Sequence, residues 1–185
     1  FDINAAANVV LAQAFLPAMI SNNHGHFMTV ASSASYFSLP NLCAYSMSKT
    51  AALAFLESLR AELRAVYKAC RVRTSVVTPT KVRTVLAEGL NEGDDDFLMP
   101  VLEPIQVARA MADTLNSGLS RNISLPLGSA LLPYLRALPE WYRGALRAMG
   151  NTDALVTPDS ISRGQQALRG HQSNLDHMKK LGVHS

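Results

Sequence analysis

The sequence is poor in several features that would each point to a particular class of protein. It has two cysteines, Cys43 and Cys70, which lie far apart without CxxC spacing, so neither a disulfide framework nor a cysteine metal site is expected. We interpret them as buried thiols in a reducing compartment. The net charge is only +3, an excess too small to indicate a nucleic acid partner.

Long apolar runs are also missing. The most apolar segment, 5–20, is interrupted by Asn8, Gln13 and Pro17, so no clean run of about 18 residues is available to span a bilayer. The chain opens at Phe1 directly into helical periodicity, which we interpret as an internal piece of a longer chain. Hydrophobic residues at 48% and charged residues at 17% exclude a disordered chain. The 185 residues fit one domain, which we place at 1–150, followed by a polar tail at 151–185.

The apolar periodicity alternates between helix and strand along the chain. An order of helix, strand, helix, strand, helix, strand predicts an α/β fold in which a parallel sheet has helices on both faces. We expect helices at 5–20, 44–66 and 105–116, with Pro104 at the start of the last, and strands at 27–31, 72–78 and 123–127.

The clearest chemical signal lies at the start of the second predicted helix. Tyr45 and Lys49 are four residues apart, so a helix places the phenol and the ammonium on one face. A positive charge beside a tyrosine favours the phenolate and lowers its pKa from about 10, which suits a general acid or base. A tyrosine-x-x-x-lysine pair alone is common, and a surface tyrosine beside a solvated lysine is the alternative.

Other residues around this pair narrow the interpretation. Ser32 follows a predicted strand 13 residues before Tyr45, at the sheet edge where ligands bind in open α/β folds. Asn4 lies just before the preceding helix, where Asp2 and Asn4 are residue types that cap helices. Pro79 ends the next strand, with Thr84 five residues later. Over residues 1–126 this pattern resembles the short-chain dehydrogenase/reductase superfamily, and most closely its subgroup that acts on retinol-like, steroid and other lipophilic substrates.

The resemblance implies a role for each matching residue. Tyr45 exchanges a proton with the substrate oxygen, Lys49 tunes Tyr45 and holds the nicotinamide ribose, and Ser32 hydrogen-bonds the reacting oxygen. Ser33 is the rival for the last role, but the 13-residue step to Tyr45 favours Ser32. Asn4 fixes a water in a proton relay that reaches Lys49.

The resemblance also assigns the cofactor and substrate contacts. Pro79, Val82 and Thr84 bind the nicotinamide end of NADP or NAD, with NADP slightly favoured, and the cofactor transfers the hydride. Tyr36 and the adjacent Phe37 lie in the loop that lines the pocket for a lipophilic substrate. The expected function is oxidoreduction between an alcohol and a carbonyl.

Two departures from the family pattern stand out. Thr80 replaces the usual glycine after the proline, and Ala34-Ser35-Tyr36 replaces a glycine-containing loop. The glycine-rich phosphate loop is nowhere in the sequence. The chain thus resembles the carboxyl-terminal part of a doubly wound Rossmann-like sheet, with four strands expected upstream and 27–31 left as an edge. We expect this chain alone to be inactive; a truncated, non-catalytic scaffold that binds no cofactor is the alternative function.

The remaining segments suggest partners. The segment 131–149 is amphipathic, with apolar residues and three arginines. It either caps the substrate pocket or packs on the domain, which is the favoured interpretation, or it lies on a membrane surface. The helices 5–20 and 44–66 correspond to those that pair in the family's homodimers. His24 and His26 form a solvated turn, so no metal is expected. The family and the cysteine usage suggest an intracellular protein, cytoplasmic or on the endoplasmic reticulum face.

Overall fold

The computed structural model describes residues 1–87, 100–149, 156–157, 159–163, 165–166 and 169–170. The predicted alternation of helices and strands is confirmed over this part of the chain. The strands are β1 (Gly25–Val30), β2 (Val72–Pro79) and β3 (Asn122–Leu125), and the helices are α1 (Ala7–Ser21), α2 (Cys43–Ala65), α3 (Pro104–Ser117), α4 (Leu132–Leu135) and α5 (Glu140–Met149).

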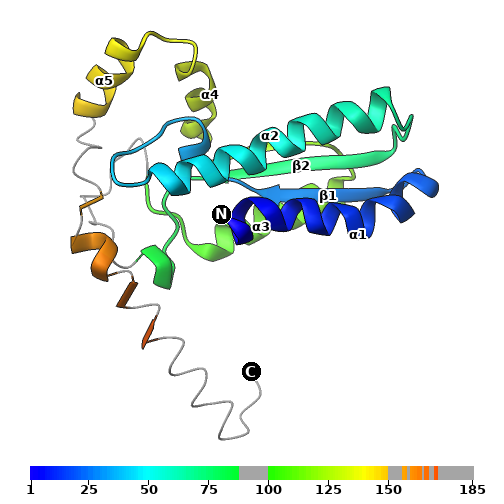
Figure 1. Cartoon of the computed structure of the whole chain (residues 1–185), viewed down its shortest axis with the longest axis horizontal. Helices are drawn as coiled ribbons and strands as arrows, with labels where there is room; N and C mark the ends of the chain where they lie inside the picture. The colour runs from blue at the N-terminus through cyan, green and yellow to red at the C-terminus, as the bar shows by residue number, and fades with distance from the viewer. Residues whose placement is uncertain (88–99, 150–155, 158, 164, 167–168, 171–185) are drawn as a thin grey trace, which may run out of the picture.

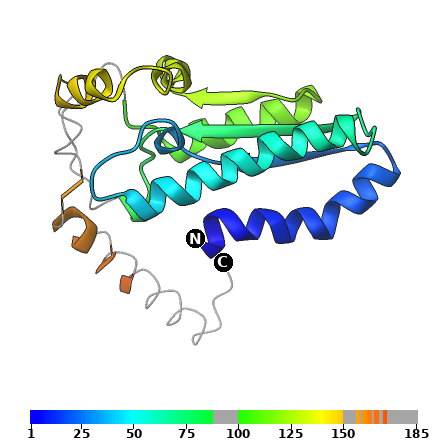
Figure 2. The ribbon, with the colours of Figure 1, turned by 45° about the horizontal axis from the view of Figure 1, so that its top comes forward.

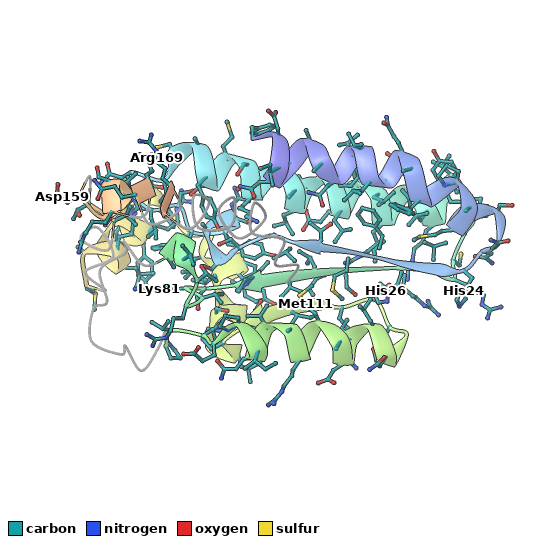
Figure 3. All side chains as sticks on the ribbon, turned by 90° about the horizontal axis from the view of Figure 1, so that it is seen from below. His24, His26, Lys81, Met111, Asp159 and Arg169 are labelled. Carbon is teal, nitrogen blue, oxygen red and sulfur yellow. The ribbon has the colours of Figure 1, made fainter. Side chains whose placement is uncertain are left out.

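The three strands form one parallel sheet in the order β1-β2-β3. The central strand β2 is buried along nearly its whole length, as expected for a strand covered on both faces. Helices α1 and α2 cover one face, and α3 covers the other (Figures 1 and 3). Among the described residues β1 is an edge strand, as the sequence predicted.

The main core lies between the sheet and the α1–α2 layer. Residues spaced three or four apart along α2 point inward, and Leu56 and Leu63 are each only 1% exposed. The Phe27 ring of β1 meets the Phe55 ring of α2 edge-on, with 6.3 Å between ring centroids. Arg60 of α2 donates to the Thr74 side chain and to Asn122, so this helix is also tied to β2 and β3 by hydrogen bonds.

Both ends of α3 carry the capping signals of a well-defined helix. Pro104 is its first residue, as predicted, and Glu103 and Gln106 form a capping box. Gly118 ends the helix at φ 62°, a left-handed conformation that glycine adopts without a steric penalty.

The first helix begins earlier than predicted. A π-helical turn, Asp2–Ala6 (η1), runs directly into α1, so Asp2 and Asn4 lie inside the helix instead of capping it. The continuous segment Asp2–Ser21 has 20 residues and a mean hydropathy of 1.6. By length and composition it could cross a membrane, which corrects the expectation that no segment could; the interrupting residues Asn8, Gln13 and Pro17 carry no charge. Ala12 and Leu16 pack its inner face against the core.

The structure also bears on the two cysteines, which were expected to be buried, and on the polar tail expected at 151–185. Cys43 and Cys70 are free thiols, but both are exposed and not buried, because Cys43 begins α2 and Cys70 lies in the turn before β2. In the described part of the predicted tail, Val156 and Ser160 are buried, and Asn41 donates to the Val156 carbonyl at 2.7 Å.

The chain beyond β3 forms an arm, defined as residues 127–149. It consists of a 3₁₀ turn, Leu127–Leu131 (η4), followed by α4 and α5. Figure 2 shows the arm past the carboxyl end of the sheet, where it reaches the loop that follows β1.

Candidate active site

The candidate residues gather at the carboxyl edge of the sheet. Ser32 lies just after β1, and Pro79 is the last residue of β2. Tyr45 and Lys49 lie in the first half of α2, which starts at this edge. Figure 3 shows Lys81 near this edge, whereas His24 and His26 lie at the opposite end of the strands. Open α/β folds bind ligands at this carboxyl edge.

Tyr45 and Lys49 share one face of α2, as their spacing predicted. The Lys49 Nζ atom lies 6.0 Å from the centroid of the Tyr45 ring. Both side chains are partly buried. An ammonium group therefore lies beside a phenol that solvent can reach.

The Lys49 ammonium is held by the backbone of β1. Its Nζ donates to the Val30 carbonyl oxygen at 3.0 Å. The Ala31 N–H of the same peptide unit donates inward to Val77 of β2 at 2.9 Å, so the Val30 carbonyl points to the outer edge of β1. Burial lowers the pKa of Lys49 below its ordinary value. Lys49 thus partners an edge carbonyl that no described strand pairs.

Ser32 is buried and begins the 3₁₀ turn Ser33–Ser35 (η2). Its Oγ accepts the Ala34 N–H at 3.2 Å and forms no direct hydrogen bond to Tyr45 among the described contacts. Ser33 is already part of the turn. Thr50 of α2 donates to the Ser35 carbonyl at 3.2 Å, so the turn is tied to the helix that carries Tyr45.

Asn4 reaches the same helix from η1. Its Nδ2 donates to the Ser48 Oγ at 3.1 Å, and the Ser48 hydroxyl donates to the Tyr45 carbonyl at 2.7 Å. Ser48 is only 1% exposed. The Asn4 side chain is thus connected to the backbone of Tyr45 through one buried hydroxyl.

Asn8 extends this network and was missed by the sequence reasoning. Its Nδ2 donates to the Asn4 carbonyl at 2.9 Å, and its Oδ1 accepts from the Thr29 hydroxyl at 3.1 Å. A carbonyl oxygen only accepts, so the amide of Asn8 can bridge the two groups in one orientation only. The sequence carries a signal for Asn8, because it is four residues after Asn4 and interrupts an apolar face. Such an interruption alone does not distinguish a hydrogen-bonded side chain from a simple break in the face.

The predicted cofactor residues follow β2. Val82 forms a parallel bridge with Leu102 that uses the Lys81 carbonyl and the Arg83 N–H, so the backbone groups of Val82 point to the other side. Pro79 is buried, and Thr84 is exposed. Thr80, which replaces the family's glycine, bonds Leu125 through its backbone, and its buried Oγ1 has no hydrogen-bond partner among the described residues.

The two aromatic residues of the loop differ in their surroundings. Tyr36 packs against the core, and burial, followed by the negative charge of Glu57, raises its pKa. The Phe37 ring lies 5.6 Å from the Arg147 guanidinium of α5. Phe37 therefore connects this loop to the arm.

Comparison with known families agrees with this arrangement. The family described as short chain dehydrogenase matches residues 1–95, just over half of the chain. The chain therefore belongs to the short-chain dehydrogenase family, and its sheet is part of that family's Rossmann-like fold.

Similar curated proteins are dehydrogenases with steroid or retinol names. Estradiol 17-beta-dehydrogenase 11 of Homo sapiens is 39% identical over 149 residues, which cover 80% of this chain and 47% of that protein. Epidermal retinol dehydrogenase 2 of Mus musculus is 38% identical over 115 residues, or 62% and 37% of the two chains. The chain thus spans about half the length of the curated relatives it matches or less.

Solved structures give the same fold. A short chain dehydrogenase from Burkholderia cenocepacia in complex with NADP has a TM-score of 0.62 and 26% identity, over 84% of this chain and 57% of its own. A short chain dehydrogenase from Mycobacterium paratuberculosis bound to NAD has a TM-score of 0.52 and 22% identity, over 69% and 54%. The second likeness supports the fold alone.

Proposed function

We propose that the whole protein containing this chain interconverts an alcohol and a carbonyl by hydride transfer with NADP(H) or NAD(H). The observation that carries the proposal is the placement of Tyr45 and Lys49 on one face of α2, which starts at the carboxyl edge of the sheet, the same edge where Ser32 follows β1. The steroid and retinol dehydrogenases among the relatives support a lipophilic substrate.

In this proposal the side chains of this chain handle the proton and the reacting oxygen. The Tyr45 hydroxyl gives its proton to the substrate oxygen during reduction and takes it back during oxidation. Ser32 donates a hydrogen bond to the same oxygen. Its Oγ accepts the Ala34 N–H, and that contact does not use the hydroxyl proton of Ser32. Asn4 holds the proton relay near Lys49 and connects to the Tyr45 backbone through Ser48.

The residues at this edge are compatible with a nicotinamide dinucleotide. The bound cofactor supplies the hydride. The half-buried Lys49 ammonium can exchange its hydrogen bond to the Val30 carbonyl for hydrogen bonds to ribose hydroxyls. The backbone N–H and carbonyl of Val82 point away from the bridge to Leu102, and in this proposal they contact the nicotinamide. We assign Pro79 and Thr84 to the same contact, with Tyr36 and Phe37 near the substrate. The similar structure in complex with NADP supports NADP, and NAD stays the alternative, because the residues that distinguish the two cofactors are not in this sequence.

We further propose that α1 and α2 mediate a homodimer. The outer side of α1 exposes several large apolar side chains, and covering them by the same helices of a second copy removes apolar surface from water. These residues are Val9, Val10, Leu11 and Phe15.

The decisive test is a tyrosine-to-phenylalanine substitution in the whole protein. Tyr45→Phe removes the proton donor and keeps the ring, so kcat for reduction of a lipophilic ketone or aldehyde should fall by about 10² or more. Tyr67→Phe is the matched control, because Tyr67 lies just beyond the far end of α2, and it should retain normal turnover. Near-normal kcat in Tyr45→Phe contradicts the proposed role.

The non-catalytic scaffold makes a different prediction. It binds no dinucleotide, and Tyr45→Phe then changes nothing. We expect the 185-residue chain alone to behave in that way, since its sequence lacks the phosphate loop. Calorimetric titration of NADPH into the chain alone and into the whole protein distinguishes the two cases.

A further inference from the structure

The arm exposes an unusual amount of apolar and aromatic side chain. Leu127 is 84% exposed, Tyr134 is 73% exposed and Trp141 is 74% exposed. Large side chains of this kind are scattered singly on most soluble surfaces, whereas here they follow one another along η4, α4 and α5. We call this set the arm face, and it comprises Leu127, Leu131, Tyr134, Trp141 and Met149.

The orientation of α5 is the reverse of that of an ordinary surface helix. Its arginines face the protein: the side chains of Arg143 and Arg147 are only 28% and 21% exposed, and both pair with Glu140. Arg147 also contacts the Phe37 ring. Trp141, Ala145 and Ala148 follow helical spacing on the exposed side. A soluble amphipathic helix places its apolar stripe toward the core. The apolar side of α5 instead faces water.

The distribution of charge indicates what covers this face. Residues 1–126 contain ten acidic and ten basic side chains, so the whole net charge of +3 arises within 127–185. Two copies of the chain that paired through the arm face would bring like charges together across a two-fold axis. An anionic surface would instead be attracted by this excess and by Arg136, the exposed arginine of the arm, although Arg143 and Arg147 face the protein. Tryptophan and tyrosine favour the boundary between lipid chains and headgroups.

We propose that the arm face docks on the surface of a phospholipid bilayer with anionic headgroups. The apolar side chains enter the boundary region, and the α5 helix axis lies along the surface and does not cross it. The ten residues of α5 are too short to span a bilayer. This proposal concerns a binding surface and does not rest on the proposed reaction.

Flotation with vesicles tests the proposal without any need for turnover. The whole protein should float with vesicles of phosphatidylcholine and phosphatidylglycerol, and less with phosphatidylcholine alone or at high salt. The double variant Leu131→Glu/Met149→Glu should bind at least tenfold more weakly, because each change places a charge on the lipid side. Both positions are exposed, so circular dichroism should show an unchanged fold.

Trp141 reports the contact directly. It is the single tryptophan of this chain, and the emission difference between the parent and Trp141→Phe isolates its signal. The difference should shift to the blue when anionic vesicles are added. Leu119→Glu is the matched control just before β3, at the end of that strand opposite the arm, where Leu119 is 51% exposed, and it should leave binding unchanged.

Several outcomes would overturn the proposal. They are the absence of vesicle binding, binding that survives the double variant, and binding without a shift of Trp141 emission. Trp141 emission that is already blue without vesicles, or that shifts with protein concentration, would mean that the chain itself or a second copy covers the face.

Discussion

The sheet with its α1–α2 layer and the arm treat apolar side chains in opposite ways. In the sheet region, Leu56 and Val76 are 1% exposed, and hydrogen bonds join Asn4 to Ser48 and Thr29 to Asn8. In the arm, Leu127 and Met149 are 84% exposed, and two arginines of α5 face inward. The first region is built to hold a geometry, whereas the second is built to present a surface.

This difference shows that two amphipathic helices of one chain can direct their apolar side chains differently, one into the core and one toward solvent. The apolar stripe of α2 faces the core, so its residues stabilise the fold and hold the helix that carries Tyr45 and Lys49 in place. Helix α5 has an equally clear stripe, but its apolar side faces outward. Periodicity alone identifies the stripe; only the fold gives its direction.

The largest expected effect contrasts one leucine from each region. Leu56→Ala removes side-chain packing from the closed core and should lower the free energy of unfolding by about 2–5 kcal/mol. Leu131→Ala, at a site that is 68% exposed, should change it by about 0.5 kcal/mol or less. Urea denaturation of both variants measures the contrast. Similar losses at the two positions would mean that the arm packs as tightly as the core.

A smaller effect tests the hydrogen-bond network below Tyr45. Thr29→Val removes the hydroxyl that donates to Asn8 and should cost about 0.5–1.5 kcal/mol of unfolding free energy. Thr80→Val is the matched control: the Thr80 hydroxyl is buried without a partner among the described residues, so its loss should be neutral or stabilising. Equal costs at both sites would remove the energetic evidence for the network.

The smallest effect concerns the other end of the strands. His26 bonds the Ser75 hydroxyl at 2.8 Å, and burial, followed by the charge of Arg73, lowers the pKa of His26 from its ordinary value of about 6.5. The unfolded chain therefore binds this proton more readily, and stability should decline as pH falls below about 6.5 toward the folded pKa.

His26→Gln should flatten this decline, because it removes the histidine whose pKa is lowered in the folded chain. Thermal unfolding between pH 5 and pH 7.5 measures the slopes of the parent and the variant, about the range in which histidine titrates. An identical slope in the parent and in His26→Gln would exclude His26 as the source.

Much of the fold could be predicted because local patterns and packing agree there. The apolar spacing of α2, the β-branched run of β2 and Pro104 at the start of α3 all correspond to the structure. The π-helical turn at Asp2–Ala6 could not be predicted in this way, because the sequence has no simple signal for it. The exposure of Cys43 and Cys70 also depends on which side of an element faces solvent.

The site was predictable at the level of the motif but not of its connections. The spacing of Tyr45 and Lys49 places them on one face, and the structure agrees. The bond from Lys49 to the Val30 carbonyl depends on β1 being an edge strand, which is a property of the sheet. The Asn8 bridge needs α1 and β1 side by side, which helical spacing alone does not reveal.

The most direct test of the central claim is to follow the hydride itself. The whole protein would be incubated with a lipophilic ketone or aldehyde and with NADPH or NADH that carries deuterium at the transferring carbon of the nicotinamide, and the product analysed by mass spectrometry. We predict that the parent forms an alcohol with one deuterium on the former carbonyl carbon, and that Tyr45→Phe forms a much smaller amount of it. A parent protein that forms no labelled alcohol with either cofactor across such substrates would contradict the account.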